Sequence, residues 1–241
     1  MYADAFFFKE IKMLKKITSY FNKTELLLWG FSVITIIASY ALNPTDSILS
    51  LTASLIGVTS LIFCAKGNPF GQVLMIIFSI IYTIISYSFS YYGEMITYFC
   101  MTLPMAVFSL ISWLRHPYKG NKSIVQVNRI KGKEIIFLIF LTCAVTIAFY
   151  FILKRLGTAN LIVSTLSVAT SFTAAYLTFR RDPYLSLFYS FNDVVLIILW
   201  VYASIKDKSY ISVAVCFSVF LINDIYCFIN LKRMEKQQTA N

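Results

Sequence analysis

The sequence predicts an all-α, polytopic membrane protein with eight transmembrane helices. Of its 241 residues, 59% are hydrophobic and only 13% are charged, and the mean hydropathy is +0.73. A water-soluble domain of this size needs more polar surface than such a composition provides. Eight apolar runs have the length of about 20 residues that a helix needs to cross the hydrocarbon core. These runs are residues 25–42, 47–65, 70–91, 94–114, 134–153, 160–179, 184–204 and 209–230.

The first 24 residues precede the first apolar run and carry five lysines among apolar residues at helical spacing. A secretory signal places its charges before its apolar core, whereas here the apolar Phe6–Phe8 run comes first. Two interpretations remain open. The segment is either an amphipathic helix whose lysines are attracted to anionic lipid or a basic tail without fixed structure.

Short loops between the runs predict antiparallel neighbouring helices. Residues 66–69, 180–183 and 206–209 are examples, and Asn68-Pro69 and Asp182-Pro183 are sound helix breaks because the residue before a proline avoids the helical region. With eight spans, seventeen of the 21 lysines and arginines fall on the side of the two termini and four on the other side. Cytoplasmic loops carry the excess of basic residues. The asymmetry therefore predicts that both termini are cytoplasmic.

The basic loop at residues 115–133 divides the chain into two groups of helices that match at an offset of 114 positions. The offset aligns Pro69 with Pro183 and Ser79 with Asp193. An even number of spans separates the matched helices, so the two groups would have the same orientation in the membrane. This pattern is typical of transporters built from parallel repeats. Any two helices with a polar residue every seven positions can also match by chance.

The run at residues 184–200 places two polar side chains, Asn192 and Asp193, near the middle of a span. Such residues are costly in hydrocarbon and usually mark a substrate or ion path. The alternative for Asp193 is a paired carboxyl group that holds helices together. Adjacent helical residues point about 100° apart, so the two cannot face one cavity equally. Glu94 begins a span, where an acid stabilises a helix N-terminus; a gating role is its alternative.

Several segments resemble the PnuC-type nicotinamide riboside transporters. They are GNPFGQ (67–72), Tyr82, YYGEM (91–95), Pro104, Trp113 and FNDVVLIILW (191–200). The resemblance covers residues 47–231. It implies a SWEET-like bundle of three helices, a linker helix at 134–153 and three further helices, with an additional N-terminal helix. It also implies a homotrimer in the bacterial inner membrane that takes up nicotinamide riboside by facilitated diffusion, driven by cytoplasmic phosphorylation. Relatives carry tryptophans where this chain has Leu185 and Phe188.

These considerations divide the chain into six parts. They are a basic N-terminal segment (1–24), an additional transmembrane helix (25–46), a first repeat (47–114), a basic loop with the linker helix (115–159), a second repeat (160–231) and a C-terminal tail (232–241).

Nicotinamide riboside has a cationic ring, a carboxamide and a ribose with vicinal hydroxyls. A site for it would combine aromatic faces with amide groups and a few convergent polar side chains in an apolar cavity. The residues expected to supply them are Gln72, Tyr82, Phe188, Asn192, Asp193, Trp200, Asn223 and Asp224. Related vitamins or nucleosides, such as riboflavin, thiamine or a deoxynucleoside, remain alternative substrates.

Other functional classes fit the sequence less well. The five cysteines lie within apolar runs without a CxxC pair, which argues against a disulfide framework and a zinc site. We expect no cofactor, no metal and no nucleic-acid partner. His116 is the only histidine, and no HExxH, GxSxG or Walker A motif is present. An intramembrane aspartyl enzyme using Asp193 and Asp224 is the remaining enzymatic alternative. An assembly or signalling subunit would leave the mid-membrane acid unexplained.

Overall fold

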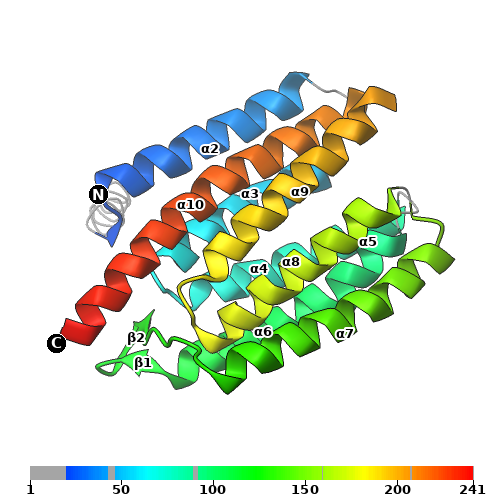
Figure 1. Ribbon diagram of the computed structural model, residues 1–241. Coiled ribbons are helices and arrows are strands. Elements are labelled where there is room, and N and C mark those ends of the chain that lie inside the picture. The colour runs from blue at the N-terminus through cyan, green and yellow to red at the C-terminus, as the bar shows by residue number, and fades with distance from the viewer. Residues whose placement is uncertain (1–19, 43–46, 89–91, 159, 207, 241) are drawn as a thin grey trace, which may run out of the picture.

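The computed structural model describes residues 20–42, 47–88, 92–158, 160–206 and 208–240. Eight helices in this part of the chain are long and apolar enough to cross a membrane, as the sequence predicts (Figure 1). The N-terminal segment at residues 1–24, for which the sequence allows an amphipathic helix or a basic tail, lies mostly outside the described residues. The elements are α2 (Lys23–Leu42), α3 (Ile48–Ala65), α4 (Phe70–Ser88), α5 (Tyr92–Ile96), η1 (Thr97–Thr102), α6 (Leu103–Arg115), β1 (Pro117–Tyr118), β2 (Asn121–Val125), α7 (Lys133–Arg155), α8 (Leu161–Arg180), α9 (Leu185–Lys206), η2 (Lys208–Tyr210) and α10 (Ile211–Ala240).

The helices form two groups that pack against each other. The first group contains α3, α4 and the continuous span from α5 to α6, and the second contains α8, α9 and α10. The groups meet where α3 contacts α10 and where α6 contacts α8. The linker helix α7 packs on α8, and α2 packs on α3 and α10 (Figure 1). This arrangement agrees with the predicted bundle of three, one and three helices plus one additional helix.

The turns before α4 and α9 have the same local structure. The side-chain oxygen of Asn68 accepts a hydrogen bond from the backbone N–H two residues later at 2.9 Å, and that of Asp182 does the same at 2.9 Å. Each is preceded by a residue with positive φ, which is Gly67 at 64° and Arg181 at 62°. Such Asx turns end one helix and begin the next. The equivalent geometry at the predicted offset supports an internal repeat.

The additional helix α2 is fastened to the bundle by a buried carboxylate. Asn22 and Glu25 form a reciprocal capping box, in which each side chain accepts a backbone N–H at 2.8 Å. Glu25 is 1% exposed and also pairs with Lys66 of the α3–α4 turn at 3.1 Å. The hydroxyl of Tyr226 on α10 donates to the same carboxylate at 3.2 Å. These bonds hold the start of α2 against α3 and α10.

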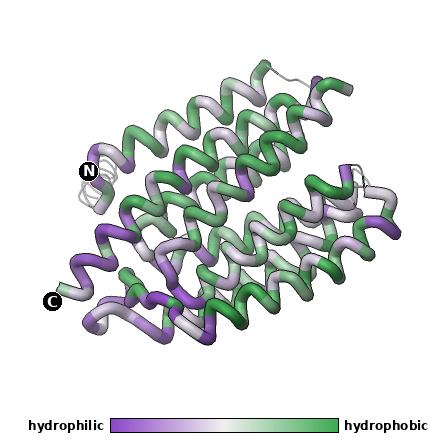
Figure 2. Tube along the Cα trace, viewed as in Figure 1, coloured by the Kyte–Doolittle hydropathy of each residue, from purple (hydrophilic) through white to green (hydrophobic). Residues whose placement is uncertain are grey.

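The polar end of the molecule is more ordered than the sequence predicts. The loop at residues 115–133 contains the antiparallel pair β1–β2, and α10 continues to Ala240 where a tail was expected from residue 232. The side chain of Gln238 accepts from the N–H of Val127 at 2.8 Å and donates to the carbonyl of Val125 at 3.0 Å. Figure 2 shows this hydrophilic end of α10 beside the hydrophilic β1–β2 loop. Tertiary contacts therefore extend the helix beyond its apolar part.

The same loop bridges the two groups of helices. The N–H of Val125 donates to the carbonyl of Gly67 at 2.8 Å, and the N–H of Asn128 donates to the carbonyl of Arg181 at 3.1 Å. These two acceptors are the equivalent residues of the two Asx turns. In addition, Asp182 Oδ2 accepts from the N–H of Ile130 at 2.9 Å. The loop thus ties the α3–α4 turn to the α8–α9 turn.

A glycine at the crossing of α3 and α4 gives a test of this packing. A Cβ atom on Gly71 would lie 2.6 Å from Cys64 Sγ and 2.9 Å from the carbonyl oxygen of Ser60. The two helices are already held together at this point, because Ser60 Oγ donates a hydrogen bond to the carbonyl of Gly71 at 2.9 Å. We expect Gly71→Ala to lower the free energy of unfolding by about 1–3 kcal/mol, measured by thermal unfolding in detergent. Gly30→Ala is the control, because no atom lies within 4 Å of its added Cβ. Equal melting temperatures for both variants would contradict this packing.

Candidate functional site

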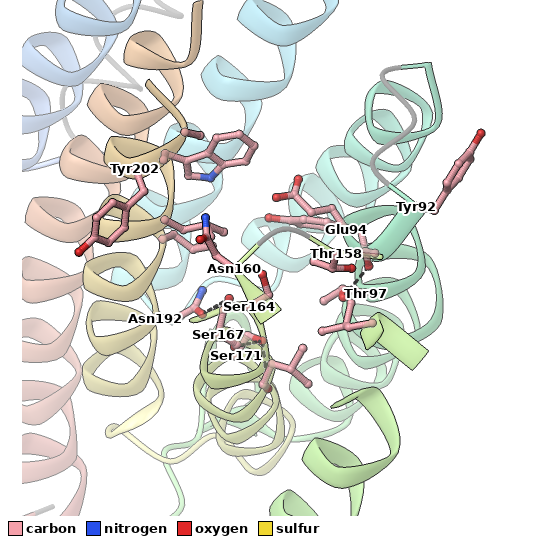
Figure 3. Close-up of a pocket in the computed structure, with 18 of the residues that line it drawn as sticks. Tyr92, Glu94, Thr97, Thr158, Asn160, Ser164, Ser167, Ser171, Asn192 and Tyr202 are labelled. Carbon is pink, nitrogen blue, oxygen red and sulfur yellow. Dashed lines mark hydrogen bonds between the residues drawn. The ribbon is translucent and has the colours of Figure 1, made fainter. Parts of the chain in front are cut away.

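A cavity of about 600 Å³ lies between the two groups of helices. One wall is formed by α4, α5 and η1, and the other by α8 and α9, with contributions from the α7–α8 turn and from α10. The cavity reaches from the helix ends near Gly157 and Tyr210 to Ser171 and Asn192, which lie in the middle of α8 and α9. Figure 3 shows polar side chains from both walls projecting into it. Its size and mixed lining are typical of a small-molecule site.

Asn192 is held in a fixed orientation on the α9 wall. Its Oδ1 accepts hydrogen bonds from Ser167 Oγ at 2.9 Å and Thr170 Oγ1 at 3.0 Å, both on α8. Since these bonds occupy the carbonyl oxygen, the amide nitrogen is left as the group that can donate to a ligand. The side chain is 8% exposed and lines the cavity. Of the adjacent polar pair on α9, Asn192 is therefore the residue that faces the cavity.

A line of serines on α8 was not identified from the sequence. Ser164, Ser167 and Ser171 are spaced by three and four residues, which places them on one face of a helix. All three line the cavity, and Figure 3 shows them following one another along α8. A signal was available, because α8 has a hydropathy of 1.4, the lowest of the eight candidate spans among the described residues. Hydroxyl groups at this spacing can bind a polyhydroxylated ligand.

Two aromatic pairs complete the lining. Tyr82 and Tyr98 lie with ring centroids 4.4 Å apart, and Trp200 and Tyr210 lie 5.4 Å apart. Tyr82 and Trp200 were expected from the sequence, whereas Tyr98 and Tyr210 were not. The aromatic faces can stack on a planar ring or bind a cation.

Tyr98 reaches the cavity because its span is not a regular α-helix. Residues Thr97–Thr102 form a π-helical turn, in which the N–H of Leu103 donates to the carbonyl of Tyr98. Pro104 follows immediately and has no N–H with which to continue a regular ladder. An additional residue in one turn rotates the preceding side chains around the helix, and such turns often occur at functional sites.

Three expected site residues lie elsewhere in the bundle. Gln72 is 3% exposed and donates to Cys64 Sγ at 3.3 Å, at the crossing of α3 and α4. Asn223 is 1% exposed and donates to Ser32 Oγ on α2 at 2.9 Å. Phe188 packs edge-to-face on Phe191 at 5.8 Å. None of the three lines the described cavity, and the contacts of Gln72 and Asn223 join helices.

The remaining two expected residues, Asp193 and Asp224, are brought together but away from the cavity. They lie on α9 and α10, are 4% and 3% exposed, and their carboxyl groups are close enough to interact electrostatically. Neither lines the described cavity. The pair joins the two helices inside the bundle, as the structural alternative for Asp193 predicts.

The charge of the cavity is unusual for so basic a protein. Among its described lining residues, Glu94 alone has a charged side chain, although the chain has a formal net charge of +10. Within the residues that the structure describes, no group of three or more histidine, cysteine or acidic side chains could hold a metal ion. The lining therefore favours an uncharged or cationic ligand.

Comparisons with known proteins agree with the resemblance in the sequence. The chain is 23% identical over 207 residues to the nicotinamide riboside transporter PnuC of Neisseria mucosa, covering 83% of this chain and 78% of that protein. It is similar to the crystal structure of the vitamin B3 transporter PnuC, with a TM-score of 0.78, 21% identity, and coverage of 90% of this chain and 94% of that chain. The similarity to this crystal structure shows a shared fold.

A family model described as "Nicotinamide mononucleotide transporter" matches residues 47–233, which is close to the range over which the sequence shows its resemblance. The match leaves out α2, in agreement with an additional N-terminal helix. The chain thus belongs to the nicotinamide mononucleotide transporter family, and it is a multi-pass membrane transporter rather than an enzyme.

Proposed function

We propose that this protein takes up nicotinamide riboside by facilitated diffusion through the cavity between the two groups of helices. The observation that carries the proposal is the composition of the lining, which combines aromatic faces, an amide donor, a row of hydroxyls and a single acid. A curated relative is named as a nicotinamide riboside transporter. Facilitated diffusion would need cytoplasmic phosphorylation of the riboside to keep uptake directed inward.

Each part of nicotinamide riboside has a chemical partner in this lining. The amide nitrogen of Asn192 can donate to the carboxamide oxygen, because its own carbonyl is occupied by α8. The ribose hydroxyls match the hydroxyls of Ser167 and Ser171. The cationic ring matches the faces of Trp200 and Tyr82. Trp200 and Tyr82 would thus supply the stacking that relatives obtain from tryptophans at the positions of Leu185 and Phe188.

The lining also favours the riboside over the mononucleotide named in the family description. A phosphate group is normally bound by arginine, lysine or the N–H groups at a helix N-terminus. No described lining residue is an arginine or a lysine, and the one charged side chain is the acid Glu94. A dianionic phosphate would therefore meet no cationic side chain in the described lining, and Glu94 at the N-terminus of α5 would repel it. We infer that the mononucleotide is excluded.

Counterflow in proteoliposomes tests this function. Vesicles loaded with unlabelled nicotinamide riboside should accumulate labelled riboside saturably, and equal concentrations of the mononucleotide, riboflavin, thiamine or a deoxynucleoside should compete poorly. Vesicles without protein provide the background. Absence of saturable flux would contradict uptake of the riboside, and equal competition by the mononucleotide would contradict the exclusion of phosphate.

We further propose that the protein resides in the bacterial inner membrane with both termini in the cytoplasm. With eight spans, seventeen of the 21 basic residues in the sequence belong to the segments on the side of the two termini and of the loop at residues 115–133, as the positive-inside rule requires. The cavity would then extend toward the outer side, because it reaches Gly157 and Tyr210 at the opposite end. Accessibility of single cysteines in the β1–β2 loop to an impermeant thiol reagent would test the orientation.

The domain division and the oligomeric state remain proposals. The matching Asx turns support two repeats at residues 47–114 and 160–231, with residues 115–159 as the connecting loop and linker helix. A homotrimer is implied by the resemblance to PnuC-type transporters. The linker helix α7 could face other copies, because it is the most hydrophobic candidate span described and only 11% of the residues in its most apolar stretch are buried. Light scattering of the detergent-solubilised protein would test for three copies.

A further inference from the structure

Glu94 is an acid at the mouth of the cavity, where the proposed function does not yet give it a role. It lies in the first turn of α5 and lines the cavity. Figure 3 shows Glu94 on the α5 wall, across the cavity from Asn192 and Tyr202 on α9. A ligand between the two walls would therefore approach its carboxylate.

The backbone around Glu94 is fixed by close packing. A Cβ atom on the preceding residue, Gly93, would lie 2.7 Å from Thr158 Oγ1 and 2.9 Å from a methyl group of Leu153. The carbonyl of Gly93 also accepts a hydrogen bond from Thr97 Oγ1 at 2.9 Å. The start of α5 is thus packed against the end of α7 and the α7–α8 turn, and this contact fixes the backbone from which the Glu94 side chain extends.

The surroundings of Glu94 suit a cation. The rings of Tyr82 and Tyr98, with centroids 4.4 Å apart and planes tilted by 41°, lie near its carboxylate and line the same cavity. Within the described ranges, the carboxylate forms none of the ion pairs and accepts none of the hydrogen bonds. Glu25, an acid in the first turn of α2, is instead paired with Lys66. An acid beside aromatic faces, with no basic side chain in the described lining, is the combination that binds organic cations.

We propose that Glu94 selects the positive charge of the ligand, and so distinguishes the cationic nicotinamide ring from neutral and anionic analogues. This inference rests on the proposed function, because it assigns a role within the same cavity. The carboxylate attracts the pyridinium charge and repels phosphate, while Tyr82 and Tyr98 offer their ring faces to the cation. Charge complementarity of this kind contributes mainly to specificity. If Glu94 only stabilised the N-terminus of α5, it would not discriminate between ligands by their charge.

The test compares two probes that differ in charge but hardly in shape. Nicotinamide riboside is cationic, whereas its 1,4-dihydro form has the same carboxamide and ribose and no charge. Calorimetric titration of the purified wild-type protein should show about tenfold tighter binding of the cationic form, which corresponds to about 1.4 kcal/mol. Glu94→Gln should weaken binding of the cationic form about tenfold and leave the dihydro form unchanged. Glu94→Asp should restore most of the preference.

A matched control makes the same chemical change outside the cavity. Glu134 lies at the start of α7 and pairs with Arg180, so Glu134→Gln should leave the ratio of the two affinities unchanged. Equal binding of the two forms by the wild-type protein, or equal weakening of both by Glu94→Gln, would overturn the role of Glu94. Binding of neither form by the wild type would overturn the proposed function together with this inference. If Glu94→Gln fails to fold, the ratio of the two affinities in Glu94→Asp, compared with the wild-type ratio, tests the same role.

Discussion

Replacement of Asn192 by alanine is expected to reduce uptake of nicotinamide riboside by about 100-fold or more, because a site built to hydrogen-bond its substrate loses this much when a buried polar partner is left unpaired. The substitution removes the amide donor from the cavity. It also leaves the hydroxyl of Ser167 without the oxygen to which it donates at 2.9 Å. Initial rates in proteoliposomes with equal amounts of protein would measure the effect.

The matched control for this variant is the preceding residue on α9. Phe191 is 50% exposed on the outside of the bundle, so Phe191→Ala should keep uptake close to the wild-type rate. A comparison of melting temperatures separates a lost ligand contact from a lost fold. Uptake by Asn192→Ala at the wild-type rate would show that the substrate does not use this wall of the cavity.

Replacement of Trp113 by alanine is expected to be the most destabilising single change considered, by about 3–5 kcal/mol. Trp113 is 1% exposed and donates from its indole N–H to the carbonyl of Thr178 at 2.8 Å. It therefore joins α6 of the first group to α8 of the second group near the polar end. The variant creates a cavity and leaves a buried carbonyl without this donor. Unfolding in detergent, followed by circular dichroism, would measure the change.

Leu114 provides the control for Trp113. It is adjacent on α6 but 48% exposed, and Leu114→Ala should change the free energy of unfolding by much less. A Trp113→Ala variant with the same free energy of unfolding as the wild type would contradict a structural role for this contact between the two groups.

The helices were predictable because hydrophobicity dictates spanning segments directly. A bilayer offers no partner for backbone polar groups, so each apolar run of about 20 residues must form its own helical bonds. The breaks at Asn68-Pro69 and Asp182-Pro183 also followed from local chemistry and are the two Asx turns of the structure. The ordered loop and the continuation of α10 to Ala240 depend instead on contacts between distant residues, such as those of Gln238 with Val125 and Val127.

The site was only partly predictable. Helical spacing shows which side chains point to the same side of a helix, but not how far along the bundle each one lies or which residues it contacts. Gln72 shares a face of α4 with Tyr82, but ten residues along a helix separate them by about 15 Å, so only Tyr82 reaches the cavity. Periodicity likewise could not decide between Asn192 and Asp193. Packing decides it, because Asn192 lines the cavity whereas Asp193 is buried beside Asp224 of α10. The turn that carries Tyr98 departs from α-helical spacing, so no regular pattern could place it.

The position of the ligand can be tested directly with a cysteine introduced at the inner end of the cavity. Ser171 lines the cavity at the middle of α8, and Ser171→Cys should react with a small, water-soluble thiol reagent above the background of the wild-type cysteines. Saturating nicotinamide riboside should suppress this reaction, whereas the mononucleotide at the same concentration should not. Labelling that is unaffected by saturating riboside would show that the substrate does not occupy the space between the two groups of helices.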